Sequence, residues 1–282
     1  MPHTPQKEKA AALLALHTSG KLLILPNVWD VIGARILQAK GFPAIATASA
    51  AISTALGFRD GERIKRDTVL EAVARIANGV DVPVTADIES GFARTTSELE
   101  DTIHGVLDAG VAGINLEDGI DDGGALRPVD EQCARIAAAR EAAARRGLHL
   151  VINARIDSYH VTPAFPAPAA ATDDAVARAA AYVEAGADCV YPIGPGDEKT
   201  VRELRARIAA PINILGSPDA APLTMLEEIG VNRVSFGPFV QRALLRKFID
   251  IADALMERKD PSGIKGMLSR ADVTEFLIDD PE

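Results

Sequence analysis

The sequence is poor in cysteine, has no long apolar run and carries no excess of positive charge. Its 282 residues include two cysteines, Cys133 and Cys189, which are far apart and lack metal-ligand spacing. This argues against a disulfide framework or a zinc site and favours a reducing compartment. No apolar run approaches the roughly 18 residues that span a bilayer. The net charge of −10 disfavours binding to nucleic acids or to anionic membranes.

The composition is that of an ordinary globular protein. Hydrophobic residues make up 48% of the chain and charged residues 25%, which is enough for a sizeable core. The first eight residues have no apolar stretch after their basic residues, so we expect no signal peptide. We therefore expect a soluble, cytoplasmic protein.

Short apolar runs alternate along the chain with amphipathic helical stretches. The candidate strands are 22–25, 44–47, 82–88, 113–117, 148–154, 189–193, 212–215 and 233–236. The candidate helices are 7–18, 29–39, 67–78, 96–109, 129–146, 173–185, 198–209, 222–229 and 238–257. The strands are continuously apolar rather than alternating, which indicates a parallel sheet covered on both faces.

Eight strand–helix repeats without a break in composition predict a single α/β domain, a closed (β/α)₈ TIM-type barrel. The alternative is an open doubly wound sheet, but no Gly-x-Gly-x-x-Gly follows the first strand. We expect a helical extension at 1–20, the barrel at 21–257 and a helical extension at 258–282. The last segment either packs on its own barrel or is exchanged with a neighbouring subunit. Residues 162–172 (TPAFPAPAAAT) predict a surface loop.

Asp87 and Glu89 stand at alternate positions at the end of a buried strand. Residues two apart in a strand point to the same face. Two carboxylates about 4 Å apart repel by about 4 kcal/mol at an effective dielectric of 20. Either the pair is a solvated strand end, or a cation, a shared proton or water relieves the repulsion.

Active-site residues of such barrels lie at the carboxyl ends of the strands and in the loops that follow. Those positions carry Ser49, Asp60, Asp87, Glu89, Asn115, Glu117, Asp118, Asn153, Arg155, Asp157, Tyr191, Asn213 and Ser235. So many carboxylate oxygens suit Mg²⁺ or Mn²⁺. Arg155 can clamp a substrate carboxylate, or it can form a structural salt bridge to Asp157 or Glu117.

Two residue types are missing from these strand ends. None of the nine lysines lies there, which argues against a Schiff-base aldolase. Of the five histidines only His160 follows a strand end, and a lone histidine there is more typical of the surface. No glycine-rich loop after the seventh or eighth strand is arranged to cradle a phosphate.

Four segments in order resemble the isocitrate lyase/phosphoenolpyruvate mutase superfamily, from about residue 23 to residue 248. They are 56–60 (LGFRD), 87–92 (DIESGF), 113–118 (GINLED) and 152–155 (INAR). The second is similar to the family's Asp-x-Asp-x-Gly-(Tyr/Phe) metal motif, with Glu89 in place of the second aspartate. The resemblance supports the barrel and implies tetramers of helix-swapped dimers, so we expect a homodimer or homotetramer.

The resemblance also implies roles for individual residues. Asp87 looks like a direct or water-mediated Mg²⁺ ligand, and Asp60, Glu89 and Glu117 look like partners of the metal's waters. Arg155 looks like the substrate clamp, and Asp60, Glu117 and Arg155 are the expected catalytic residues. The segment 47–51 (TASAA) is similar to a loop that grips a 2-oxo acid, with Ala48 replacing the usual serine. The expected substrate-binding residues are Thr47, Ser49, Ala50, Asn153, Arg155 and Asn213.

The chain departs from the family after Asp118. Isocitrate and 2-methylisocitrate lyases carry a Lys-(Lys/Arg)-Cys-Gly-His loop at this place, and phosphonate-forming members carry a longer gating loop. Here only residues 119–128 (GIDDGGALRP) precede the next helix. Cys133 falls inside that helix and does not replace the catalytic cysteine.

These features favour a Mg²⁺-dependent lyase that acts on a small 2-oxo acid through a metal-stabilised enolate. Oxaloacetate decarboxylation is the sharpest version, because its first step needs only chelation and enolate stabilisation. Three alternatives stay open. They are a 2-methylisocitrate or isocitrate lyase-like activity with an unidentified acid, phosphoenolpyruvate mutase or phosphonopyruvate hydrolase chemistry, and non-catalytic binding of a 2-oxo acid such as 2-oxoglutarate.

Overall fold

The computed structural model describes residues 4–120, 124–161, 168–257 and 259–277. Its larger sheet has six parallel strands in the order β2 (Asn27–Val28), β3 (Ile45–Thr47), β4 (Val84–Asp87), β5 (Gly113–Glu117), β8 (Val151–Ile156) and β9 (Cys189–Pro192). A second parallel sheet has the order β1 (Leu23–Leu25), β11 (Arg233–Ser235) and β10 (Asn213–Leu215). The predicted parallel α/β fold is therefore confirmed.

Two local features connect these sheets. A parallel bridge joins Val190 of β9 to Ile212, the residue before β10. At the other side, β1 and β2 flank Pro26, which has no N–H to donate. Residues 23–28 thus form two short strands instead of one. Strand β1 pairs with β11, and β2 pairs with β3.

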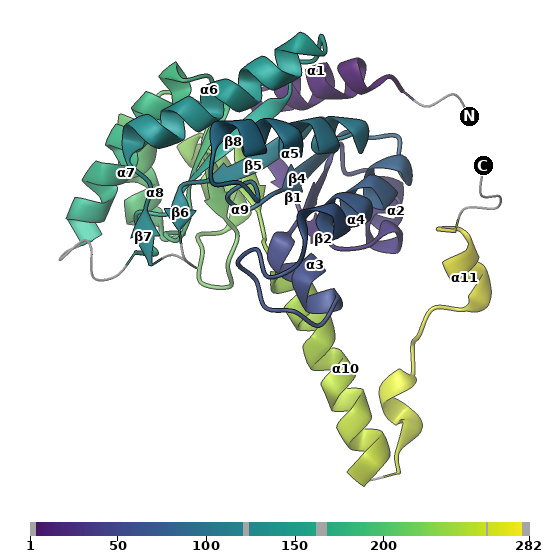
Figure 1. Ribbon diagram of the computed structural model, residues 1–282. Coiled ribbons are helices and arrows are strands. Elements are labelled where there is room, and N and C mark those ends of the chain that lie inside the picture. Colours follow the sequence, from purple (N-terminus) through teal and green to yellow (C-terminus); the bar gives the residue numbers. More distant parts are fainter. Residues whose placement is uncertain (1–3, 121–123, 162–167, 258, 278–282) are drawn as a thin grey trace.

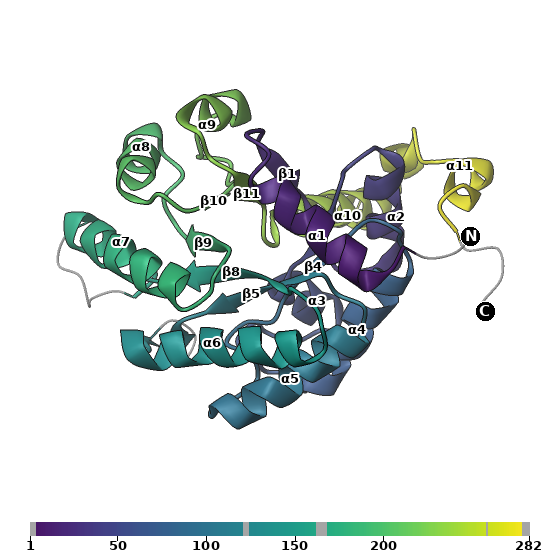
Figure 2. The same ribbon diagram turned by 90° about the horizontal axis from the view of Figure 1, so that it is seen from above.

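Helices lie on the outside of the strands (Figure 2). They are α2 (Val31–Ala39), α4 (Arg66–Asn78), α5 (Thr96–Asp108), α6 (Val129–Arg145), α7 (Pro168–Glu184), α8 (Glu198–Arg207) and α9 (Leu223–Ile229). Helix α5 shows why such segments fold locally. Thr95 and Glu98 form a capping box at its start, and Leu99, Ile103 and Val106 bury one face.

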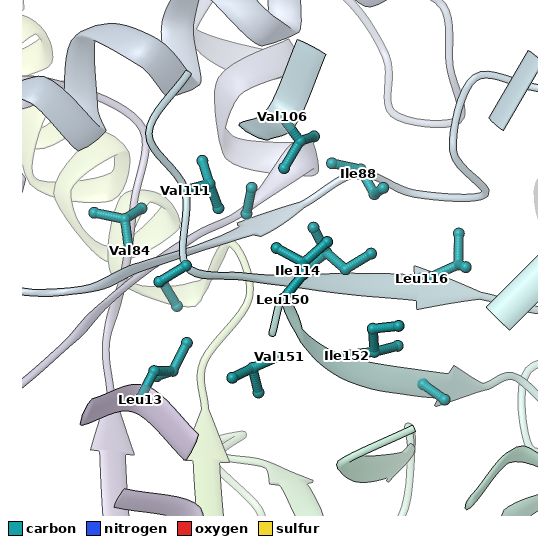
Figure 3. Close-up of a cluster of buried hydrophobic side chains, with 14 of the residues drawn as sticks. Leu13, Val84, Ile88, Val106, Val111, Ile114, Leu116, Leu150, Val151 and Ile152 are labelled. Carbon is teal, nitrogen blue, oxygen red and sulfur yellow. The ribbon is translucent and has the colours of Figure 1, made fainter. Parts of the chain in front are cut away.

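Helix α1 (Gln6–His17) packs against the amino-terminal ends of the strands. Its Leu13 is fully buried and lies beside Val151 at the start of β8 (Figure 3). Gly113, at the start of β5, leaves room for it, since a Cβ there would stand 2.8 Å from Leu13 Cδ2. The core thus continues from the strands to the helix that covers this end, and the opposite end stays open for a site.

Several predicted boundaries are wrong. The fifth strand was expected at 148–154 but runs from Val151 to Ile156, because the Leu150 carbonyl accepts from Arg140 Nη1 instead of continuing the strand. Helix α7 begins at Pro168, inside the predicted loop 162–172, of which residues 162–167 lie outside the described part. Helix α3 (Ser49–Ala55) and the hairpin of β6 (Gly119–Ile120) and β7 (Ala125–Leu126) were not predicted.

The last part of the chain forms an arm that extends away from the strands (Figure 1). It consists of helix α10 (Phe239–Glu257), the 3₁₀ turn η1 (Pro261–Ile264) and the short helix α11 (Arg270–Thr274). Within the described residues, no helix is both long and apolar enough to cross a membrane. Cys133 and Cys189 are both free thiols.

Candidate functional site

The carboxyl ends of the parallel strands surround a cavity of about 210 Å³. Its lining includes Ser49 and Ala50 from α3, Asp87 from β4, Arg155 from β8 and Tyr191 from β9. A second opening of about 420 Å³ shares Asp60, Arg155 and His160 with it and adds Glu89, Glu117 and Asp157. The fold therefore brings Arg155 together with Asp60, Asp87, Glu89, Glu117 and Asp157. Asp118 is fully buried and lies outside both linings.

Asp87 is held by the segment after β3. Its backbone N–H donates to Thr47 Oγ1 at 3.0 Å, and its Oδ2 accepts from Ser49 N at 3.1 Å and Ser49 Oγ at 2.9 Å. Helix α3 begins at Ser49, so its unpaired first N–H groups face a carboxylate. Thr47 is fully buried and supports Asp87 from behind, whereas Ser49 and Ala50 line the cavity.

Glu89 sits in a tight turn after β4. Its φ of 53° and that of Gly91, 91°, lie in the left-handed region. A Cβ on Gly91 would stand 2.5 Å from Leu99 Cδ1, so only glycine fits this turn without displacement. Glu89 Oε2 accepts from Glu62 N at 2.6 Å, and Oε1 has no hydrogen-bond partner among the described residues.

Mutual repulsion and burial shift the acid groups in one direction. Burial, then the charges of Asp60 and Asp87, raises the pKa of Glu89 to about 8. Burial and the charge of Asp87 raise the pKa of Asp60, and burial raises the pKa of Glu117 well above its usual range despite the nearby Arg155. Too little positive charge lies near these three side chains to keep their pKa values in the range of free carboxyl groups.

Arg155 is anchored by two acids. Its Nη1 lies 2.7 Å from Glu117 Oε2, and its Nε and Nη2 donate to Asp157 Oδ1 at 3.0 and 2.7 Å. Burial lowers its pKa, but Glu117, Asp157 and Asp87 outweigh this and hold the pKa of Arg155 above its usual range. The structural salt bridges are therefore present, and Arg155 lines the cavity as well.

Asn153 and Asn213 lie deeper than the cavity lining. Both are fully buried. Asn153 Nδ2 donates to Asn115 Oδ1 at 2.8 Å, and Asn213 Nδ2 donates to Ser235 Oγ at 2.9 Å. Since Asn115 and Ser235 line the cavity, the two asparagines support its floor.

Three further residues line the cavity. Tyr191 is almost fully buried, and burial raises the pKa of its hydroxyl. His160 lies at the rim, where burial lowers the pKa of its imidazole. Arg242 comes from the first turn of α10, beside Phe239. The sequence placed Tyr191 and His160 at strand ends but assigned neither a role. Arg242 was missed, because it lies in a helix rather than at a strand end.

The donor set fits a hard divalent cation that keeps most of its water. Among the described residues, no three histidine, cysteine or carboxylate side chains converge for direct coordination. A cation nearby would nevertheless let the buried carboxyl groups with raised pKa values ionise, and it would attract the unpartnered Glu89 Oε1. Mg²⁺ satisfies both conditions, because it is commonly bound through one or two carboxylates and several waters.

The hairpin β6–β7 occupies the place of the family's catalytic loops. Gly119 borders the opening near Glu117 and Arg155. Cys133 lies in α6, where it donates to the Ala181 carbonyl, and burial raises the pKa of its thiol. Its thiol is thus turned to a neighbouring helix and is a poor acid or nucleophile.

Comparison with known proteins gives consistent matches. The family model described as phosphoenolpyruvate phosphomutase matches residues 13–256. Protein Rv1998c of Mycobacterium tuberculosis (strain ATCC 25618 / H37Rv) is 35% identical over 222 residues, which are 79% of this chain and 80% of that protein. The solved structure of a candidate phosphonomutase from Burkholderia cenocepacia J2315 is 37% identical with a TM-score of 0.82, covering 88% of this chain and 98% of the other.

Relatives with named activities differ in their chemistry. The 2-methylisocitrate lyase of Bacillus subtilis (strain 168) is 28% identical and matches 73% of this chain and 67% of its own length. Oxaloacetate decarboxylase 2 of Pseudomonas fluorescens (strain Pf0-1) is also 28% identical, over 75% of this chain and 72% of its own. These two relatives are thus named for reactions of different small acids, and the names do not agree on one reaction.

Proposed function

Since the chain belongs to the phosphoenolpyruvate phosphomutase family, within the isocitrate lyase/phosphoenolpyruvate mutase superfamily, we propose that it is a Mg²⁺-dependent lyase acting on a small 2-oxo dicarboxylic acid. Decarboxylation of oxaloacetate is the specific reaction that we propose. The observation that carries this proposal is the single cavity in which Arg155 faces Asp87 and Asp60. One end of this cavity suits a carboxylate, and the other suits a cation.

Asp87 would bind Mg²⁺, or Mn²⁺ in its place, and Asp60, Glu89 and Glu117 would hold its water ligands. A bound divalent ion acts as a Lewis acid that stabilises negative charge on the 2-oxo oxygen. A solved phosphonopyruvate hydrolase of this fold, in complex with oxalate and Mg²⁺, supports the use of a divalent metal.

The protein's own residues account for substrate binding. Arg155 clamps the carboxylate next to the 2-oxo group, and the N–H of Ala50 in the first turn of α3 donates to a substrate oxygen. Ser49 stays bonded to Asp87. Arg242 at the rim supplies a second cation, which favours a substrate with two carboxylates. The distal carboxylate leaves as CO₂, and the electron pair of the broken C–C bond moves into an enolate.

A proton must then return to the carbon that lost CO₂. We assign this step to Tyr191, whose hydroxyl stays protonated because its pKa is raised by burial. Tyr191 lines the same cavity as Arg155 and Asp87. The tyrosine regains its proton from water at the open mouth.

The absence of a catalytic-cysteine loop disfavours isocitrate-type cleavage. The short hairpin β6–β7 likewise disfavours phosphonate chemistry, which uses a longer loop in the family. A non-catalytic 2-oxo-acid binder would keep Asp87 and Arg155, so turnover has to be measured directly.

The test is release of pyruvate from oxaloacetate above the rate of Mg²⁺ alone. Wild type is expected to exceed this rate, and Asp87→Ala is expected to fall to it. Asp101→Ala, on the exposed face of α5, is a matched control that should behave as wild type. Equal rates for wild type, Asp87→Ala and Mg²⁺ alone would refute the proposal, and calorimetric binding of 2-oxoglutarate without turnover would support a binder.

The proposal includes the architecture in which the site is built. We propose that the strands close into a (β/α)₈ barrel over 21–257, flanked by helical extensions at 1–20 and 258–282. Asn27 supports closure because it bonds to both neighbours of its strand. Its Nδ2 donates to the Thr47 carbonyl at 2.7 Å, and its Oδ1 accepts from the N–H groups of Phe236 and Gly237 at 2.7 and 2.9 Å.

A further inference from the structure

A larger cavity of about 550 Å³ lies beside the candidate active site. It is lined by residues of the segment 61–66, by the turn after β4, and by strand β6 and Arg127. Four arginines line it: Arg63, Arg66, Arg94 and Arg127. Glu89 and Glu117 form the wall that it shares with the opening at the strand ends. The proposed lyase reaction uses none of these arginines.

The acids of this cavity are already engaged. Glu62 Oε1 accepts from Ser90 Oγ at 2.8 Å and from the Phe92 N–H at 2.7 Å. Glu98 accepts from the backbone N–H groups of Arg94 and Thr95 as part of the α5 capping box. These carboxylates hold the turn and the helix start, and the charges of Glu62 and Glu98 also attract Arg135. Arg66 is paired with Asp67, whose Oδ1 lies 3.1 Å from its Nε.

Two buried arginines at the inner side have nitrogen atoms without a hydrogen-bond partner among the described residues. Arg127 is 8% exposed, and its Nη1 pairs with Glu131 at 2.6 Å while its Nε has no hydrogen-bond partner. Arg135 of α6 is 1% exposed and donates through Nη2 to the Ser90 carbonyl. Its Nε and Nη1 have no partner, and no carboxylate in the described ranges forms an ion pair with it.

Such an arrangement is costly in an empty protein. Burial of a charged group is unfavourable unless ion pairs and hydrogen bonds compensate it, and each unmet buried donor adds to this cost. Burial, and then the like charge of Arg127, lowers the pKa of Arg135 to about 10. A bound anion would give Arg127, which lines the cavity, a partner for its Nε. Its charge would also act on Arg135, which holds the carbonyl of the lining residue Ser90.

We propose that this cavity is a phosphate-binding site, for inorganic phosphate or for the phosphate group of a small monoester. A tetrahedral dianion accepts hydrogen bonds from several directions, which suits arginines that come from three separate segments. The cavity is larger than a phosphate alone requires, so an organic group can accompany it. Its ligand would brace the segment that carries Asp60 and Glu62, next to the candidate metal site.

The test uses calorimetry of the full-length protein, freed of divalent metal with a chelator, at low ionic strength. Inorganic phosphate and glycerol 3-phosphate are titrated in separate experiments, with chloride at matched ionic strength as the reference. We expect saturable binding of one phosphate group per chain. Arg94→Gln and Arg127→Gln should each weaken it by about tenfold or more, the loss of one charge-assisted hydrogen bond.

Two control variants locate the ligand. Arg202→Gln removes an exposed arginine of α8 that pairs with Glu198, and Arg242→Gln removes the rim cation of the substrate cavity. Both should bind phosphate as wild type does. Circular dichroism checks each fold, and Arg94→Gln keeps the test decisive if the buried Arg127 variant is unstable.

The outcomes separate clearly. Tighter binding of glycerol 3-phosphate than of phosphate would identify a monoester as the occupant, and equal binding would identify phosphate itself. Absence of saturable binding, an equal response to chloride, or loss of binding only in Arg242→Gln would overturn the proposal. No turnover is measured, so this test can succeed or fail independently of the lyase assignment.

Discussion

Glu89 combines three unfavourable features in one residue. Its backbone is left-handed, its side chain is 3% exposed, and one carboxylate oxygen has no partner among the described residues. A non-glycine residue in this conformation costs about 1–3 kcal/mol and persists where its surroundings enforce it, often at functional sites. The bond from Glu62 N holds the carboxylate toward Asp60 and Asp87, where a cation would stabilise it.

We therefore predict that Mg²⁺ affinity rises with pH up to about 8 and then levels off. The metal-free folded protein keeps a proton on Glu89 between its ordinary pKa of 4.5 and about 8, and Mg²⁺ must displace it. One displaced proton changes the affinity by at most about tenfold per pH unit. Calorimetry between pH 6 and 9 measures this slope.

Glu89→Gln supplies the comparison, since its amide carries no proton to displace. The slope should flatten in this variant, and its metal-free form should lose the corresponding pH dependence of unfolding. In wild type, the stability due to this proton is complete below pH 4.5 and is lost as pH rises through about 8. An unchanged slope in Glu89→Gln would assign the displaced proton to another acid.

Tyr191→Phe is predicted to lower kcat for oxaloacetate decarboxylation by about 100-fold or more, the usual contribution of a proton donor. KM should change little because Arg155, which binds the carboxylate, is not altered. Steady-state kinetics on both constants checks this. His160→Asn is the matched comparison at the rim of the same cavity, and a large loss of kcat in that variant alone would move the donor role to His160.

Asp87, Glu117 and Arg155 could be predicted because they lie at the ends of strands, so their place at one mouth depends only on the strand order. Arg242 could not be predicted, because it lies in the first turn of α10 and only the path of this helix brings it to the cavity. The buried positions of Asn153 and Asn213 were also hidden, because sequence spacing does not distinguish the cavity lining from the layer below it.

At the scale of elements, a buried network links β5, β8 and α7. Asp118 follows β5 and accepts from the Asp157 N–H at 2.9 Å, from Tyr182 Oη at 2.6 Å and from Arg178 Nη1 at 3.2 Å. Asp157 in turn holds the guanidinium of Arg155. Helix α7 thereby fixes the position of the substrate clamp from a distance.

Tyr182→Phe is predicted to reduce the free energy of unfolding by about 1–2 kcal/mol, because Asp118 loses a hydrogen bond in a fully buried place. Denaturant unfolding measures this loss. Since Asp157 and Arg155 would be held less firmly, KM should rise more than kcat falls. Tyr159→Phe is the matched control and should keep the wild-type KM. This variant removes the hydrogen bond from the Tyr159 hydroxyl to Thr172 of α7.

The sequence predicts correctly whether a segment is a helix or a strand wherever it has a long stretch of helical periodicity or a continuous apolar run. Helix α3 was missed because 49–55 (SAAISTA) is short and follows a strand without a turn signal. The β6–β7 hairpin was missed because its strands have two residues each, and their pairing depends on the bond from Arg127 N to the Asp118 carbonyl. Such elements depend on tertiary contacts rather than on local preference.

At the scale of the whole molecule, the arm exposes an unusual amount of apolar surface. Helix α10 buries only Gln241 and Ala254. Phe248 and Met256 of α10 are 68% and 75% exposed, and Met267, which follows η1, is 76% exposed. An apolar surface of this kind on an isolated chain marks a protein–protein interface. We propose that the arm packs on a second copy, as in a homodimer or a tetramer of such dimers with exchanged helices.

Phe248→Asp is predicted to weaken this assembly, because it places a charge at the centre of the exposed apolar face. Sedimentation equilibrium should give at least a dimer for wild type and a shift toward monomer for the variant at micromolar concentration. Lys247→Asp, the neighbouring polar position on the same helix, changes the charge in the same direction and should leave the assembly intact. A monomeric wild type would show that the arm packs on its own barrel in solution. An unchanged assembly in Phe248→Asp would place the interface elsewhere.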